Sequence, residues 1–402
     1  MDPRKMFVGA VFQDRETLLG DMNSSGITGI SYHREGKMVV SACGEYIRLI
    51  DCLSGTSKKQ IKCYKYGVSC ISYTHDVHSI LHGSHRELVK QGPALSSLNL
   101  EKGDALSIRY LSLYDNKYLR VFRGHEKPVS SLAMNPKNDT FYSAATDDKI
   151  AIWDLNSPHG ALAVIDIAML GLTAPSIDVD SKGMVFSVIG TPTQPHRDSL
   201  GLILQFDSRN YEAGPFAKIS IKKEHILEAV SSTNEKRKSY AWVPQVRKTL
   251  VDRLSRSQWT GIESSPDGNC LLVKTDCAAH LVYDAFDGNP LAVLFDDDAT
   301  FSSGTGARTF TEFFDPPSTS DAAFSPGGDY VVGGGDDGLL RIWKLPSFPS
   351  PAVPDMPAVA LTSPQNTLEA HVEAVRHVRF NPAYAQACSA CANTCLWLSP
   401  PS

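Results

Sequence analysis

Short apolar runs rich in β-branched residues recur along the chain, and each ends in a large side chain followed by a turn. The clearest, Lys149–Asp154, reads Lys-Ile-Ala-Ile-Trp-Asp. The other copies are 47–51, 204–207, 281–284, 340–344, 395–398 and a weaker one at Ile108–Ser112. Aligned on the residue after the large side chain, successive copies lie 42 to 77 residues apart. Repeats of this length with a Trp-Asp ending predict the blades of a β-propeller.

Each blade needs four short antiparallel strands, and the third copy indicates them best. Strands are expected at Val129–Met134, 141–145 and Lys149–Asp154, with turn residues between them. The last copy ends at 398 and leaves no room for a fourth strand, whereas the run 5–13 precedes the first inner strand, Ile27–Tyr32. We therefore predict an all-β chain: one seven-bladed WD-repeat β-propeller over residues 1–402, closed by its N-terminal strand.

Four stretches exceed the length of a blade and are predicted to be loop insertions, at about 85–104, 190–200, 218–256 and 346–366. The last is rich in proline and should be an extended, poorly ordered loop. The stretch 218–256 carries ten Lys/Arg against four Asp/Glu, a net charge of +6 on a chain otherwise at −11. Val246, Leu250 and Leu254 lie at helical spacing and predict a short amphipathic helix. This helix either contacts nucleic acid or an acidic peptide, or packs on the propeller rim.

Composition excludes several classes of protein. A net charge of −5 does not indicate a nucleic-acid binder, and no run reaches membrane-spanning length. Nine scattered cysteines indicate reduced thiols in a soluble intracellular protein. Cys388-x-x-Cys391 lacks a second ligand pair, and the glycine-rich run 303–306 lacks a following Gly-Lys-Ser/Thr, so no metal or cofactor is expected. The aspartates at 296–298 suggest a solvated acidic turn.

A polar network can be inferred in the third blade, where a histidine precedes the first strand and an aspartate lies six residues before a tryptophan. Its members are His125, Ser143, Asp147 and Trp153. Asp337, Trp343 and His371 repeat single members in later blades, and Cys391 stands where the seventh blade should carry aspartate. A catalytic His/Asp/Ser set is conceivable, but recurrence at blade phase favours a structural network, so no catalytic residue is predicted.

One blade ends in Phe206-Asp207-Ser208-Arg209. An aromatic-Asp-x-Arg ending resembles the docking signature of propellers that serve cullin ubiquitin ligases. The aromatic residue and the aspartate are blade residues in any case. A substrate receptor of a cullin-type ligase therefore stays open as the alternative function.

Several blocks carry a more specific resemblance. They are 65–68, 108–118, 214–217, 259–261, 284–286 and 380–398. Through them the chain resembles the Swd-two family, the WD-repeat β-propeller subunit of the COMPASS histone lysine methyltransferase complex. Two features depart from the family: Asn156 stands where animal members tend to carry arginine, and the basic insertion has no counterpart.

The resemblance implies a non-catalytic nuclear scaffold, a monomer within a larger complex, that supports methylation of lysine four of histone H three. Its implied partners are the N-terminal segment of the methyltransferase subunit, subunits of mRNA 3′-end cleavage/polyadenylation and transcription termination, protein phosphatase complexes and the phosphorylated polymerase tail. Nucleic acid is a further partner that the basic insertion could bind.

The loops that open the inner strands should line one end of the ring, where a linear peptide could contact several blades. The partner-binding candidates on these loops are Tyr66, Lys127, Trp259 and Glu373. Tyr66 and Trp259 are proposed as aromatic anchors, although Trp259 could equally pack on the rim. Lys127 could pair with an acidic or phosphorylated tail.

Overall fold

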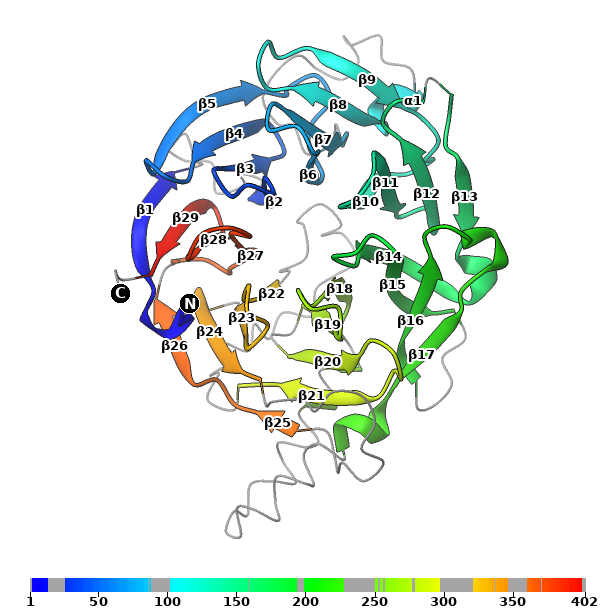
Figure 1. Cartoon of the computed structure of the whole chain (residues 1–402), viewed down its shortest axis with the longest axis vertical. Helices are drawn as coiled ribbons and strands as arrows, with labels where there is room; N and C mark the ends of the chain where they lie inside the picture. Colours follow the sequence, from blue (N-terminus) through cyan, green and yellow to red (C-terminus); the bar gives the residue numbers. More distant parts are fainter. Residues whose placement is uncertain are drawn as a thin grey trace.

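The computed structural model describes residues 2–13, 26–85, 87, 102–157, 159–193, 199–227, 250–251, 254–255, 257–276, 279–296, 321–335, 337–345, 360–369 and 371–399. Within them, seven sheets, antiparallel except for one added strand in blade five, follow one another around a central axis (Figure 1). The seven-bladed β-propeller predicted from the repeats is confirmed.

The first three blades contain four strands each. They are β2 (Ile27–Tyr32), β3 (Met38–Cys43), β4 (Tyr46–Asp51) and β5 (Thr56–Lys62); β6 (Ile71–Tyr73), β7 (Ser79–Gly83), β8 (Ile108–Ser112) and β9 (Tyr118–Phe122); and β10 (Val129–Met134), β11 (Thr140–Ala145), β12 (Lys149–Asp154) and β13 (Ala163–Asp166). A short α-helix, α1 (Lys102–Ala105), precedes β8, and no described helix is long and apolar enough to span a membrane.

The later blades complete the ring. Their strands are β14 (Leu172–Val179), β15 (Val185–Pro192), β16 (Ser199–Asp207) and β17 (Ala217–Lys222); β18 (Trp259–Ser264), β19 (Cys270–Thr275), β20 (His280–Asp284) and β21 (Pro290–Leu294); β22 (Ala322–Phe324), β23 (Tyr330–Gly334), β24 (Leu339–Lys344) and β26 (Asn366–Glu369); and β27 (His377–Phe380), β28 (Gln386–Ala390), β29 (Asn393–Leu398) and β1 (Phe7–Gln13). We call the end of the ring that carries the loops into each inner strand the upper end, and the other the lower end.

The middle strands are apolar on both faces because each blade lies between two others. In β12, Ile150, Ala151, Ile152 and Trp153 are all buried. The outer strand β13 of the same blade alternates instead between half-buried and exposed residues, since one of its faces meets solvent. Continuous apolar runs therefore mark the middle strands, and alternation marks the rim.

The ring is closed by the two ends of the chain. β1 pairs antiparallel with β29, from Phe7 opposite Leu398 to Gln13 opposite Asn393, so the N-terminal strand is the fourth strand of blade seven (Figure 1). Met6 is buried in the core between blades six and seven. The predicted closure is confirmed.

Asparagine side chains tie neighbouring blades together at the lower end. The Asn135 amide donates to the Gly183 carbonyl at 3.0 Å, and the Asn381 amide donates to the Gly36 carbonyl at 2.7 Å. Both glycines have positive φ, and a Cβ on either would collide with the asparagine side chain. The two turns repeat the same contact between blades three and four and between blades seven and one.

Two predicted insertions are partly blade structure. Within 190–200, the described residues extend β15 to Pro192 and begin β16 at Ser199. Within 346–366, residues 360–362 form β25 (Ala360–Thr362), which pairs parallel with β21 at the edge of blade five (Figure 1). The expectation of a poorly ordered loop was wrong for this part; 346–359 lie outside the described residues, as does most of 85–104.

The basic stretch 218–256 is anchored in the core at both described ends. It begins inside β17, and Ile226, Leu250 and Leu254 are buried in the same cluster as Trp259. Leu250 and Leu254 are helical, as the apolar spacing predicted, and they pack on the propeller. Residues 228–249 lie outside the described residues.

Removing residues 1–13 should destabilise the whole protein, because it exposes the edge of β29 and the space filled by Met6. We expect a lower melting temperature and aggregation, measured by thermal unfolding and light scattering. Val11→Ser, at a side chain 54% exposed on the same strand, is the matched control and should change the melting temperature little. A truncated protein that stays monomeric and melts like the full chain would contradict this closure.

Candidate functional site

The network inferred in blade three is assembled at the upper end. Trp153 Nε1 donates to Ser143 Oγ at 2.8 Å, and Ser143 Oγ lies 2.7 Å from His125 Nε2. His125 Nδ1 lies 3.2 Å from the Asp147 carboxylate, which also accepts the backbone N–H of Glu126. Burial lowers the pKa of His125 and outweighs the opposing effect of Asp147, so the imidazole is neutral.

This arrangement leaves no reactive group available. Ser143 is completely buried, and its hydroxyl already engages both the indole and the imidazole. The Asp147 carboxylate accepts hydrogen bonds from the loop before β10 and from the turn before β12. The network therefore holds that loop against that turn and offers a substrate no access to the hydroxyl.

Blade seven repeats the network with a thiol in place of the carboxylate. His371 Nε2 lies 2.6 Å from Ser389 Oγ, and its Nδ1 lies 3.1 Å from Cys391 Sγ. Trp397 Nε1 donates to the same serine at 2.8 Å. Burial lowers the pKa of His371 to about 4 and raises that of the Cys391 thiol, so both groups are neutral and no thiolate forms.

Blade six departs from the predicted network. Arg341 bridges Asp337 and Asp296 at 2.6 Å each. It lies opposite Gly333 in the strand register, at the place that Ala151 takes opposite Ser143 in blade three. Asp337 therefore pairs with an arginine and not with a histidine. The Trp343 indole N–H has no hydrogen-bond partner within the described residues. Asp296 is 8% exposed, so its assignment to a solvated turn was wrong; 297–298 lie outside the described residues.

Blade two carries another arginine at the same register. Arg109 lies opposite His82 and is buried, with its Nε donating to Ser84 Oγ at 3.0 Å. Its guanidinium carbon lies 3.2 Å from the centre of the Tyr66 ring, a close cation–π contact. Tyr66 also packs edge-on against Tyr118. The predicted anchor Tyr66 is thus a half-buried member of a packed cluster.

The remaining partner-binding candidates differ in exposure. Trp259 is 7% exposed, and its Nε1 donates to the Leu200 carbonyl at 3.1 Å. Its assignment as an exposed anchor was wrong, and the packing alternative describes it. Lys127 is exposed and Glu373 is half-buried, on the loops that lead into blades three and seven. Both stay predictions as partner contacts.

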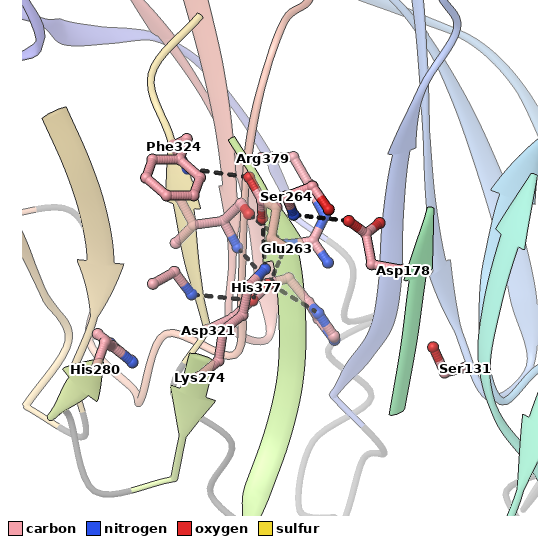
Figure 2. Close-up of polar contacts among 12 residues, drawn as sticks. Ser131, Asp178, Glu263, Ser264, Lys274, His280, Asp321, Phe324, His377 and Arg379 are labelled. Carbon is pink, nitrogen blue, oxygen red and sulfur yellow. Dashed lines mark hydrogen bonds and ion pairs between the residues drawn. The ribbon is translucent and has the colours of Figure 1, made fainter. Parts of the chain in front are cut away.

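Side chains on the inner strands accept backbone N–H groups from the next blade around the central channel (Figure 2). Asp178 accepts the Ser264 N–H at 2.7 Å, Glu263 accepts the Phe324 N–H at 3.0 Å, and Asp321 accepts the Val378 N–H at 3.2 Å. Serines do the same elsewhere: Ser31 accepts the Tyr73 N–H, and Ser131 accepts the Ile177 N–H. Sequence analysis missed these contacts, whose signal is a serine, aspartate or glutamate on or next to the inner strands of blades one, three, four, five and six.

Ion pairs join these carboxylates across blades five, six and seven. Lys274 Nζ lies 2.6 Å from Glu263 and 3.0 Å from Asp321, and Arg379 lies 2.5 Å from Asp321 (Figure 2). Burial opposes ionisation of Asp321, but Arg379 and Lys274 outweigh it and hold its pKa well below the ordinary value. Asp178 forms no direct ion pair among the described residues, and burial raises its pKa to about 6.

Replacing Asp178 by asparagine keeps an oxygen for the Ser264 N–H and removes the charge. The folded-state pKa of Asp178 is raised above its unfolded value, so the wild type loses stability as pH rises through about 4 to 6. As the pH rises to about 7, the free energy of unfolding of the variant should therefore increase relative to that of the wild type. Above that pH, the difference between the two free energies, which we call the gap, should stay constant. Urea denaturation at several pH values measures it, with Asp329→Asn as the exposed control. A gap that does not vary with pH would refute the assignment.

No group of three or more His, Cys, Asp or Glu side chains in the described part of the chain is placed to hold a metal ion. The charged residues at the channel are engaged with one another and with backbone groups. What the described residues offer is a rigid ring with exposed loops at both ends, which is suited to binding other proteins.

Comparison with known proteins supports this reading. The family model "WD domain, G-beta repeat" matches residues 116–154 and 313–344. A chain in the solved structure of the mitotic checkpoint complex superposes with a TM-score of 0.59 over 96% of this chain and 94% of that chain. Its identity is 12%, so it shows the fold alone.

Three relatives match nearly the whole chain. WD repeat-containing protein 82 of Drosophila melanogaster is 28% identical over 94% of this chain and 91% of its own length. COMPASS component SWD2 of Saccharomyces cerevisiae is 26% identical over 89% of this chain and 86% of its own length. Set1 complex component swd2 of Schizosaccharomyces pombe is 24% identical over 96% of each chain. Together with the seven blades, these comparisons show that the chain is a WD-repeat β-propeller that is similar over most of its length to proteins named SWD2 and swd2.

Proposed function

We propose that this protein is a non-catalytic scaffold subunit of a nuclear COMPASS-type histone lysine methyltransferase complex, where it supports methylation of lysine four of histone H three. The observation that carries the proposal is similarity over most of the length of two proteins named as COMPASS and Set1 complex components. A ring in which the buried Ser143 hydroxyl is already engaged by an indole and an imidazole fits a scaffold better than an enzyme.

The upper end is the surface on which we place the N-terminal segment of the methyltransferase subunit. Lys127 and Glu373 project from loops that open two different blades, so one extended segment could contact both. Tyr66 adds a half-buried ring fixed by Arg109, which costs little conformational entropy on binding.

A second role in mRNA 3′-end processing and transcription termination is part of the same proposal. It rests on the family resemblance, with Lys127 as the contact for a phosphorylated polymerase tail. A shorter match to pre-mRNA-processing factor 17 of Saccharomyces cerevisiae, 30% identical over 122 residues, also belongs to an RNA-processing protein. It covers 29% of this chain and carries little weight.

The alternative, a cullin-type substrate receptor, rests on 206–209. Phe206 is completely buried and stacks on Phe186, and the Asp207 carboxylate accepts the Arg209 N–H within its own turn. Blade packing thus accounts for two of the three signature residues. Arg209, whose side chain is 71% exposed, is the one left for an adaptor.

Purification of the tagged full-length chain, followed by quantitative mass spectrometry, separates these functions. We expect methyltransferase and 3′-end processing subunits, reduced at least about tenfold by Lys127→Glu combined with Glu373→Lys. Arg209→Glu, at the lower end, is the matched charge-reversal control and should leave them unchanged. Cullin adaptors that co-purify with the wild type and disappear with Arg209→Glu would favour the alternative. If neither variant reduced its own set of co-purified subunits, both proposed binding surfaces would be excluded.

The basic insertion is proposed as a peripheral contact for nucleic acid. Because its described ends are buried, we confine the replacement to 228–249, which holds five Lys/Arg against two Asp/Glu. A Gly/Ser linker in its place should lower the affinity for single-stranded RNA and flatten its salt dependence, measured by fluorescence anisotropy. A linker of equal length with the five basic residues kept is the control. Unchanged RNA affinity at an unchanged melting temperature would refute this role.

A further inference from the structure

The outer edge of blade seven is formed by β1, and it differs from the edges of most other blades. Charges on an edge strand oppose its pairing with a further strand. The fourth strands of blades one, two, three, four and six all carry such charges: Lys58, Lys59 and Lys62 in β5, Arg120 in β9, Asp166 in β13, Lys218 and Lys222 in β17, and Glu369 in β26. β1 reads Phe-Val-Gly-Ala-Val-Phe-Gln and carries none.

Blade five has the other uncharged fourth strand, and the chain itself covers it. β21 reads Pro-Leu-Ala-Val-Leu, and β25 pairs with it as a fifth strand. β1, in contrast, pairs with β29 alone among the described residues and lies on the outside of the ring (Figure 1). Phe7, Val8 and Val11 are 48%, 37% and 54% exposed. The outer edge of β1 is therefore an apolar, uncharged strand edge that meets solvent.

The sequence of β1 indicates what fits this edge. Residues 7–12, Phe-Val-Gly-Ala-Val-Phe, read almost identically in both directions. When two copies of this strand run antiparallel, Phe7 can lie opposite Phe12 of the second copy, and Val8 can lie opposite Val11 of the second copy. A two-fold axis generates this self-complementary contact, to which each copy contributes the same residues.

A bulge in β1 makes this register consistent with the two sides of the sheet. Residues directly opposite each other in an antiparallel pair point to the same side. In a regular strand Phe7 and Phe12 would point to opposite sides, because successive side chains alternate. The register with β29 shifts at the bulge, so Phe7 lies opposite Leu398 and Phe12 lies opposite Thr394, which share one side of β29. Both phenylalanines therefore face the same side, and the two valines share the other.

We propose that two copies of this chain pair through the outer edges of β1 and form a symmetric dimer. The two sheets of blade seven then become one continuous sheet, with the phenylalanine pairs on one side and the valine pairs on the other. The contact involves one strand of each copy, so we expect a dimer that dissociates in the micromolar range. The monomer implied by the family resemblance is the competing expectation. The proposal does not rest on the methyltransferase assignment.

Sedimentation velocity of the full-length protein, from about 1 to 200 µM, tests the proposal. We expect the mass to shift from one chain to two over this range. Val8→Lys combined with Val11→Lys places lysines opposite each other across the two strands and should weaken dimerisation at least about tenfold. Val8→Glu combined with Val11→Glu should do the same. An equimolar mixture of the two variants should restore a dimer, because each lysine then faces a glutamate.

Leu162→Lys combined with Val164→Lys is the matched control, at side chains 52% and 54% exposed on the outer side of blade three. It should leave the dimer unchanged. If a double variant in β1 melts below the wild type, Val11→Lys alone replaces it, since Val11 is the most exposed of these side chains.

Three results would overturn the proposal, and the first needs no variant. They are a wild type that stays monomeric throughout the range, a dimer that the β1 substitutions weaken no more than the control does, and a mixture of the two variants that stays monomeric. A monomeric wild type whose co-purifying subunits are lost with the lysine substitutions in β1 would assign this edge to a strand of another protein instead.

Discussion

Each blade of this ring is stabilised mainly by the blades on either side, so the pairing of β1 with β29 is the contact on which the others depend. The middle strands can be apolar on both faces because closure covers both faces. Burying a large side chain such as Trp153 or Phe206 contributes about 1.5–3 kcal/mol, and each of these residues depends on an adjacent blade. An open ring would leave two blades with one uncovered face and an unpaired edge.

Hydrogen bonds and ion pairs at the central channel also make each blade depend on its neighbours. Asp321 joins blade six to the Lys274 ammonium of blade five and to the Arg379 guanidinium and the Val378 N–H of blade seven. A carboxylate with this many partners stays ionised although it is buried. Asp178 forms no ion pair among the described residues, and burial raises its pKa.

One position in the blade shows why the polar networks are structural. At the upper end of blade three, this place holds a cluster of histidine, serine, tryptophan and aspartate. Blade seven has Cys391 in place of the aspartate, and blade six has Arg341 between two aspartates. Blade two uses Arg109 under the Tyr66 ring. Several chemistries therefore occupy the same place in the blade, and in blade six the Trp343 indole N–H has no hydrogen-bond partner among the described residues. A catalytic site would not allow such replacement of its groups.

Local patterns predicted the strands, and contacts between distant residues escaped them. β10 and β12 have the predicted bounds because turn residues flank an apolar run, and the missing fourth strand of blade seven predicted ring closure. Trp259 was misassigned because an indole in a loop-flanking position has the same sequence signature whether it faces solvent or covers Gly201. The Asp296–Arg341 pair spans 45 residues, and a three-residue parallel strand such as β25 has no periodicity to detect.

The two ends of the ring are built differently. At the upper end, buried networks clamp the loops that lead into the inner strands, and Lys127, Met169 and Val372 are exposed on these loops. At the lower end, turns are fixed by backbone bonds and asparagine contacts, which leaves side chains such as Phe216 free to point outward. Between the ends lie closely packed, mostly buried strands, which fix the two ends relative to each other. We therefore expect partners bound at the two ends to be held close together by the ring.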